Sequence, residues 1–258
     1  IKLSEGATEH DHLALLGVLN SSTACFWLKQ NSQSKSGSGM GRGIQPESWM
    51  DRYEFTGTTL EDFPLPEELP ADRARRLDGL ATQGAASFSK ATVPPLGVPT
   101  ASGLDASREA IESVRARMIA EQEELDWQVY GAYRLLDEDL TYAGSDLPVV
   151  RLGERTFEIA LARKVAAGEE ETAWFARHAS TPITEIPTHW PPGYRELVQR
   201  RLVLIGSGLA VLGWFARDLR RLLNESNAGV VHVHGSGCVV VAALAMVGNA
   251  FPAALPFE

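Results

Sequence analysis

One long amphipathic stretch constrains the fold of this chain more than any other feature. Between Asp105 and Leu136, apolar side chains recur at intervals of three and four residues, a spacing that places them on one face of a helix. The stripe consists of Ile111, Val114, Met118, Leu125, Val129, Tyr133 and Leu136. Asp105 or Ser107 is a suitable N-cap residue. A helix of about 30 residues reaches roughly 45 Å, and this length favours a spacer or a bundle over a compact active site.

The remaining patterns predict shorter elements around this helix. Further helices are expected over residues 12–31, 70–87, 174–178 and 194–202. The polar and aromatic alternation of "RYEF" (52–55) predicts a short strand followed by a turn at Gly57, and "PVVRLGERTFEIALAR" (148–163) predicts a hairpin that turns at Gly153. The sequence therefore predicts an α+β fold that is mostly helical, with a long helical spacer, a small hairpin and two or three short strand pairs in all.

Composition sets limits on the class of protein. With 258 residues, of which 44% are hydrophobic, the chain can build one large core or two smaller ones. It begins with Ile1, so we expect it to be part of a longer polypeptide. We expect Cys25 and Cys238 to be reduced thiols of a cytoplasmic protein, and neither long apolar run (203–216 and 230–255) to cross a membrane. The formal net charge of −9 argues against a protein that coats nucleic acid with its whole surface, but it permits a local cationic site.

One segment of this acidic chain carries no carboxylate. No Asp or Glu occurs between Asp11 and Glu47, whereas Lys29, Lys35 and Arg42 are present. The same segment carries amide side chains at Gln30, Asn31 and Gln33. Cations favour phosphate contact through counterion release, nearby carboxylates oppose it, and amides can read base edges. The segment therefore has the chemistry of a polyanion-binding loop, and the alternative is a flexible surface loop whose lack of acids is accidental.

Two patterns near the C-terminus begin like binding motifs without completing them. An apolar run followed by Gly206-x-Gly208 starts like a dinucleotide-binding turn, but Val211 occupies the position of the third glycine. His232 and His234 would need at least one further ligand and a second shell to hold a metal. No local signature of a Ser-His-Asp or Cys-His arrangement is present, so we expect neither a metal site nor a catalytic residue in this chain.

Four motifs resemble, in the same order, the C-terminal half of PglX-type DNA methyltransferases. They are "HLALLGVLNSSTACFWLKQ", "RYEFTGTTLEDFPLP", "ELDWQVYGAYRL" and "IPTHWPPGYRELVQRRL", and together they cover about residues 1–202. Such enzymes belong to phage-defence systems of the BREX or phage-growth-limitation kind and are similar to single-chain type IIG restriction–modification enzymes. The resemblance implies a parent protein that is an S-adenosylmethionine-dependent, adenine-N6-specific DNA methyltransferase. It also implies that the present region carries part of the target-recognition domain with its helical spacers.

The resemblance supplies no catalytic or cofactor residue. The family's Asn/Asp-Pro-Pro-Tyr/Phe motif, which holds the flipped adenine, does not occur, because the Pro-Pro pairs in "VPPL" and "WPPG" have other neighbours. The glycine loop for S-adenosylmethionine is also missing. We therefore expect the isolated chain to be inactive as a methyltransferase and not to bind S-adenosylmethionine. After Leu202 the sequence becomes apolar and departs from the family pattern, which suggests an unrelated tail or a change of reading frame.

The sequence thus predicts four parts and one DNA-binding surface. The parts are a portion of the target-recognition domain (1–66), a helix with a Pro/Gly linker (67–103), the long helix with a hairpin and a helical C-terminal region (104–202), and an atypical apolar tail (203–258). The predicted DNA-binding residues are Lys29, Gln30, Asn31, Gln33, Lys35, Arg42 and Arg52. We expect the cations to contact phosphates and the amides to be candidates for base edges.

The expected partners follow from the resemblance. They are double-stranded DNA, the catalytic methyltransferase domain of the same parent chain, and other phage-defence proteins. Two alternatives stay open. The first is a helical protein-interaction module that does not bind nucleic acid, and the second is a flavin- or nicotinamide-binding protein built on Val203–Leu212.

Overall fold

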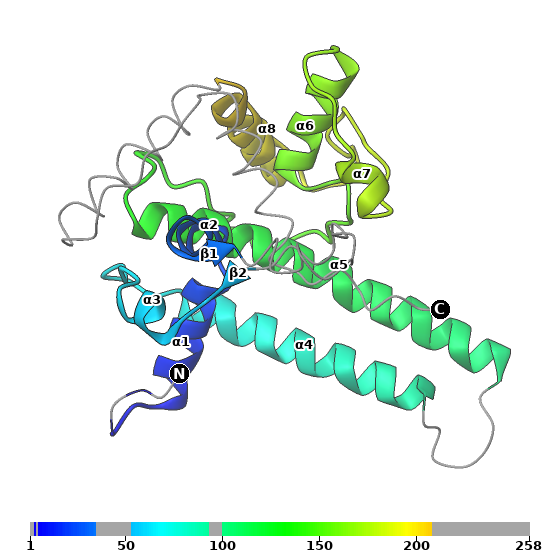
Figure 1. Ribbon diagram of the computed structural model, residues 1–258. Helices are drawn as coiled ribbons and strands as arrows, with labels where there is room; N and C mark the ends of the chain where they lie inside the picture. Colours follow the sequence, from blue (N-terminus) through cyan, green and yellow to red (C-terminus); the bar gives the residue numbers. More distant parts are fainter. Residues whose placement is uncertain (1–2, 4, 35–52, 93–99, 208–258) are drawn as a thin grey trace, which may run out of the picture.

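The computed structural model describes residue 3 and residues 5–34, 53–92 and 100–207, which are mainly helical (Figure 1). The helices are α1 (Glu9–Leu19), α2 (Ser22–Asn31), α3 (Gly57–Glu61), α4 (Ala71–Thr92), α5 (Ala101–Ala132), α6 (Thr156–Ala166), α7 (Trp174–Arg177) and α8 (Pro192–Gly206). The described strands, β1 (Gln33–Ser34) and β2 (Tyr53–Glu54), form one antiparallel pair in which Gln33 lies opposite Glu54. This architecture confirms the expected mostly helical α+β class, with a single strand pair among the described residues.

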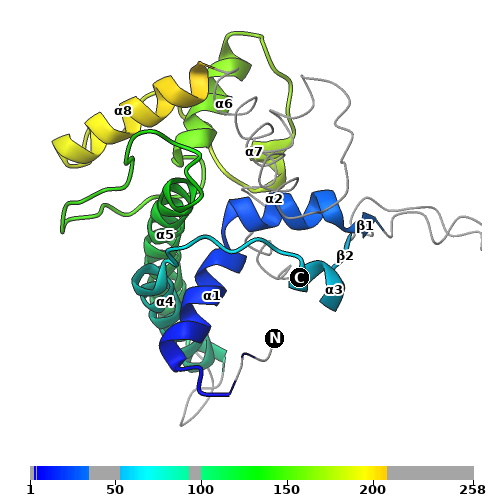
Figure 2. The same ribbon diagram turned by 90° about the vertical axis from the view of Figure 1, so that its left-hand side faces the viewer.

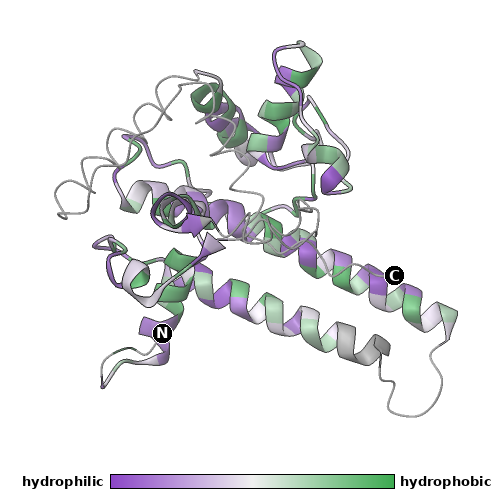
Figure 3. Cartoon of the chain, viewed as in Figure 1, coloured by the Kyte–Doolittle hydropathy of each residue, from purple (hydrophilic) through white to green (hydrophobic). Residues whose placement is uncertain are grey.

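Helices α4 and α5 run side by side through the molecule, and their far ends project together beyond the other elements (Figure 1). The predicted helix over 105–136 is confirmed, but it starts earlier. Thr100 is the N-cap in place of Asp105 or Ser107, and its hydroxyl accepts a hydrogen bond from the Gly103 amide at 3.2 Å. The buried members of the predicted stripe are Val114, Leu125, Val129 and Tyr133. Both helices carry hydrophilic and hydrophobic residues along their length, as expected for helices with one buried face (Figure 3).

The single helix predicted over residues 12–31 is wrong, because the structure divides it into α1 and α2. Ser21 has an extended backbone, and its hydroxyl accepts a hydrogen bond from the Ala24 amide at 3.2 Å. Serine is a favourable N-cap residue, so a second helix begins here and takes a new direction (Figure 2). The apolar spacing of threes and fours continues across the break, which is why periodicity alone misses it.

The hairpin predicted over 148–163 is also wrong. The chain does turn at Gly153, whose φ is +95°, but it continues into α6. The Glu158 carboxylate accepts hydrogen bonds from the amides of Gly153 and Arg155, at 2.8 and 3.2 Å, and so satisfies the start of this helix. Good helix formers then fill its interior ("IALARKVA"). At Gly57, where a turn is expected, the short helix α3 begins instead.

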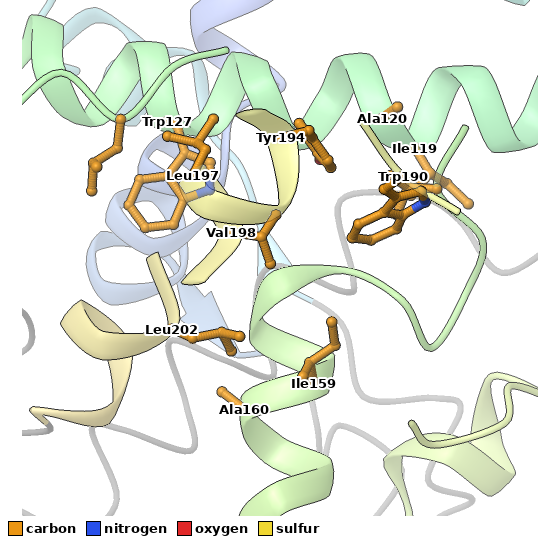
Figure 4. Packing of buried hydrophobic residues seen from close by; sticks show 12 residues of the cluster. Ile119, Ala120, Trp127, Ile159, Ala160, Trp190, Tyr194, Leu197, Val198 and Leu202 are labelled. Atoms are coloured by element: carbon orange, nitrogen blue, oxygen red, sulfur yellow. The ribbon is translucent and has the colours of Figure 1, made fainter. Parts of the chain in front are cut away.

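Two apolar clusters pack against different faces of α5. The N-terminal cluster consists of Val18, Ala24, Phe26, Trp27, Leu28, Phe63, Leu125, Val129, Tyr133 and Leu135. The C-terminal cluster consists of Ile119, Ala120, Trp127, Leu140, Val150, Ile159, Ala160, Trp190, Tyr194, Leu197, Val198 and Leu202. Figure 4 shows side chains of α8 that point into the space between α5 and α6. A single long helix therefore forms part of both cores.

The apolar run after residue 202 continues α8 as a helix to Gly206. A dinucleotide-binding turn requires a strand before its first glycine, so the helical course of this run counts against the nucleotide-binding alternative. Residues 208–258, which include His232 and His234, lie outside the described part of the chain. Within the described residues, no helix has both the length and the apolar character needed to cross a membrane.

Candidate nucleic-acid interface

Four of the seven predicted DNA-binding residues belong to the described part of the chain, and they lie close together. They are Lys29, Gln30 and Asn31 in the last turn of α2, and Gln33 in β1. All four side chains are at least partly exposed. The three that lie outside the described residues are Lys35, Arg42 and Arg52. The structure therefore places the first residues of the predicted DNA-binding segment at the exposed end of one helix.

Asn31 has a structural contact that the sequence did not reveal. Its side-chain amide donates a hydrogen bond to the Trp27 carbonyl at 2.8 Å. This carbonyl lies one helical turn before Asn31 on the same helix. One amide donor of Asn31 is thus engaged with the backbone of its own helix, and Gln30 and Gln33 are the amide side chains better placed for an external ligand.

Two exposed aromatic residues beside this site were missed by the analysis of the sequence. Tyr53 is 41% exposed and Phe55 is 50% exposed. Their ring centroids are 6.5 Å apart and their planes are within 7° of parallel. The Lys29 ammonium lies 5.8 Å from the centroid of the Tyr53 ring, at the range of a cation–π contact. The alternation in "RYEF" predicted the strand, but it could not indicate whether the aromatic side would be covered by the fold.

The start of α2 is fixed to α5. The Ser22 amide donates a hydrogen bond to the Asp126 carboxylate at 2.7 Å, and the Ser22 and Tyr130 hydroxyls lie 2.7 Å apart in a second hydrogen bond. Further along α2, the buried Trp27 ring packs edge-to-face on Phe63, with centroids 5.2 Å apart. Because α2 is held at its start and along one side, its exposed last turn has a defined position relative to α5.

Asp126 is buried, and burial raises its pKa to about 7, although hydrogen bonds from Ser22 act in the opposite direction. Its carboxylate accepts hydrogen bonds from the Ser22 backbone amide at the start of α2 and from the side-chain amide of Gln122, whose Nε2 lies 3.4 Å away. Among the described residues, no group of three or more His, Cys, Asp or Glu side chains is arranged to hold a metal ion. The contacts of Asp126 therefore indicate a structural role, in which it holds the start of α2 in place.

Arg201 of α8 forms the most buried ion pair of the described structure, with 0% exposure of both side chains. Its Nη2 donates a hydrogen bond to Glu124 at 2.7 Å, and its Nε donates one to the Leu140 carbonyl at 3.0 Å. The guanidinium lies over the Trp127 ring, 4.9 Å from its centroid. Glu124 also accepts a hydrogen bond from the Tyr142 amide at 2.7 Å. Burial raises the pKa of Glu124 by more than the Arg201 charge lowers it.

Glu123 binds the start of α6, just as Asp126 binds the start of α2. Its carboxylate accepts hydrogen bonds from the Thr156 amide, at 3.1 Å, and from the Thr156 hydroxyl. Next to it, Glu158 pairs with Arg155 at 2.9 Å. Burial alone would raise the pKa of Glu158, but the hydrogen bonds and charge of Arg155 outweigh it and leave that pKa below its usual value. We refer to Glu123, Glu124 and Asp126 as the α5 carboxylate cluster; it connects α5 to α6, α8 and α2 respectively.

Comparison with known proteins shows that this chain is similar to part of a longer protein. Residues 118–212 match a family described as a domain of unknown function, DUF7008. The adenine-specific methyltransferase PglX of Streptomyces coelicolor is 52% identical over 218 residues, which are 82% of this chain and 18% of the relative. No solved structure matches the chain. The matched domain includes Glu123, Glu124, Asp126 and Arg201, and the segment that carries Lys29 lies before it.

Proposed function

The chain belongs to the PglX-type family over the segment in which the sequences align, and on this basis we propose that it contributes to DNA target recognition in an adenine-specific DNA methyltransferase. The observation that carries the proposal is the identity of more than half of the aligned residues to PglX. S-adenosylmethionine is the methyl donor of the proposed parent enzyme. The chain spans about a fifth of the length of its relative. The proposal therefore concerns target recognition by this segment and leaves methyl transfer to the rest of the parent protein.

The arrangement of side chains at the end of α2 supports a role in DNA binding. Lys29 offers a partly exposed cation for a phosphate, and Gln30 and Gln33 offer amide groups that can pair with base edges. The sequence that follows adds Lys35 and Arg42 before the first carboxylate appears at Glu47. The α5 carboxylate cluster holds the start of α2, which gives this surface a fixed position relative to the rest of the protein.

The test is DNA binding by the full-length parent enzyme that carries Lys29→Ala, Lys35→Ala and Arg42→Ala together. Binding should weaken, and the plot of log affinity against log salt concentration should become shallower by about 3, since each lost phosphate contact removes about 0.9 from the slope. The matched control removes three cations that each pair with an acid three residues away on α4 or α5: Arg75, Arg108 and Arg115. Unchanged binding by the first variant would contradict the assignment.

A methyl-transfer assay complements the binding measurement. The isolated chain should transfer no methyl group from radiolabelled S-adenosylmethionine to DNA, because it carries no Asn/Asp-Pro-Pro-Tyr/Phe motif. The second candidate function, a protein-interaction module, is favoured by the projecting ends of α4 and α5, where residues 101–106 are all exposed (Figure 1). Salt-sensitive binding to DNA by the parent enzyme, lost in the triple variant, would decide for target recognition.

A further inference from the structure

The Tyr53 and Phe55 side chains form an exposed aromatic pair next to the candidate interface. Large aromatic side chains usually lie mostly buried, whereas these two are 41% and 50% exposed. They are separated by one residue in an extended segment, so they lie on the same side of it. The intervening Glu54 alternates to the other side, opposite Gln33 of β1 in the strand pairing. The pair is therefore a flat apolar surface that the described fold leaves open.

The geometry of the pair fits a planar aromatic ligand. The two ring planes are within 7° of parallel, and their centroids are 6.5 Å apart, about the distance that two residues span along an extended strand. The ammonium of Lys29 lies 5.8 Å from the Tyr53 ring centroid, which brings a cation to the edge of the aromatic surface. Aromatic faces combined with a nearby cation are the elements with which proteins bind unstacked nucleobases and their phosphates.

We propose that Tyr53 and Phe55 form a stacking site for an unpaired nucleobase, and that Lys29 binds the phosphate of that nucleotide. The proposal rests on the proposed DNA-binding function and deepens it, because it assigns the aromatic pair to a base that has left the duplex stack. The adjacent amide groups of Gln30 and Gln33 remain available for bases that stay paired. The interface thus has two kinds of contact, a stacking contact for an extruded base and polar contacts for the duplex.

The occupant follows from charge and shape. An apolar protein segment would gain from the two rings but would place the Lys29 ammonium against a surface with no counter-charge. A nucleotide satisfies both features, since its base has a π-face and its phosphate is an anion. The absence of any acid at positions 12–46 agrees with an anionic ligand on this side of α2.

The experiment uses the full 258-residue chain and three oligonucleotides: a perfect duplex, the same duplex with a single bulged 2-aminopurine, and the single strand that carries 2-aminopurine. Stacking on an aromatic side chain quenches 2-aminopurine fluorescence, so binding should quench the bulged probe. Tyr53→Ala with Phe55→Ala should remove the quenching and weaken binding of the bulged duplex by about 10-fold, while binding of the perfect duplex changes little. Tyr53→Phe should retain both properties because it keeps the ring.

Leu65→Ala is the matched control, because Leu65 is a 55% exposed apolar side chain outside the pair. Equal affinity of the double alanine variant and the unchanged chain for the bulged duplex, with unchanged quenching, would overturn the stacking site while leaving salt-dependent duplex binding intact. Absence of salt-dependent binding to all three oligonucleotides would overturn the proposed DNA-binding function and the stacking site together. If the pair binds a protein and not DNA, the expected result is this same absence of binding to all three oligonucleotides.

Discussion

Asp126 is a carboxyl group that the fold shields from water and also uses to hold the start of α2. Its pKa is raised from 3.8 to about 7, chiefly by burial. Between these two pH values the folded chain retains a proton that the unfolded chain loses. The free energy of unfolding contributed by Asp126 therefore decreases as pH rises from about 4 to 7 and is constant above that range. A raised carboxyl pKa thus makes this residue a cost to stability at neutral and alkaline pH.

Asp126→Asn should remove this pH dependence, because the amide oxygen can still accept the Ser22 hydrogen bond and no charge is buried. At pH 8 we expect the variant to be more stable than the unchanged chain by about 1–3 kcal/mol, and at pH 4 we expect little difference. Urea unfolding at both pH values measures this. Asp126→Ala is the contrasting variant, since it leaves the Ser22 amide without its acceptor, and it should be less stable than Asp126→Asn by about 1–3 kcal/mol at either pH. Equal stability differences at pH 4 and pH 8 for Asp126→Asn would contradict the raised pKa.

Arg201 tests the opposite situation, a buried charge that has its partner. Arg201→Met would leave the Glu124 carboxylate buried without its cation, and we expect a loss of about 3–5 kcal/mol in the free energy of unfolding. Glu124→Leu in the Arg201→Met background should recover part of this loss, because it removes one of the two buried carboxylates, Glu123 and Glu124, that pair with Arg201. Recovery should be incomplete, since the Leu140 carbonyl and the Tyr142 amide have then lost their partners. A double-mutant cycle by urea unfolding gives the coupling, and strict additivity of the two changes would exclude the buried pair.

At the scale of elements, the crossing of α1 over α4 depends on a glycine. A Cβ atom at Gly17 would lie 2.9 Å from the Ala74 Cβ and 3.1 Å from the Pro70 Cγ. Alanine there would force the two helices apart, and such overpacking costs about 1–3 kcal/mol. Gly79, on the same helix as Ala74, has nothing within 4 Å of the corresponding position.

The two glycines therefore give opposite predictions for the same substitution. Gly17→Ala should lower the free energy of unfolding by about 1–2 kcal/mol, because overpacking exceeds the gain in helix propensity. Gly79→Ala should raise it by about 0.5–1 kcal/mol, because only the propensity term acts. Both values follow from chemical unfolding, and a stabilised Gly17→Ala variant would show that the helices do not cross this closely.

The elements show what the sequence could and could not predict. Apolar periodicity located α4, α5 and the helical part of α8, because each buries one continuous face. It missed the break at Ser21 because the apolar spacing continues across it, and it missed the helix at Thr156. Carboxylates of α5 that are 104 and 33 residues away also contact these two helix starts, and periodicity does not reveal such contacts. The same limit applies to the site. The amides and cations were visible in the composition, whereas the exposure of Tyr53 and Phe55 depends on which surface the rest of the fold leaves uncovered.

At the scale of the whole molecule, α5 joins the segment that carries the candidate interface to the DUF7008 region. It contributes Leu125 and Val129 to the N-terminal cluster, and Ile119 and Trp127 to the C-terminal cluster. Unfolding of α5 would expose both clusters together, and the α5 carboxylate cluster would lose its partners in α2, α6 and α8 at the same time. The described structure should therefore unfold in one cooperative step, although the matched domain begins within α5 at residue 118.

Fluorine NMR can test this cooperativity, because 5-fluorotryptophan places at least one reporter in each cluster. Trp27 is 1% exposed in the N-terminal cluster and Trp190 is 2% exposed in the C-terminal cluster. Single Trp→Phe replacements assign the two signals among the six tryptophans. We expect both native signals to disappear at the same urea concentration. Leu28→Ala, which truncates the N-terminal cluster at a cost of about 2–5 kcal/mol, should lower both midpoints by the same amount. If only the Trp27 midpoint moved, the two cores would be independent units and α2 would not be held through α5.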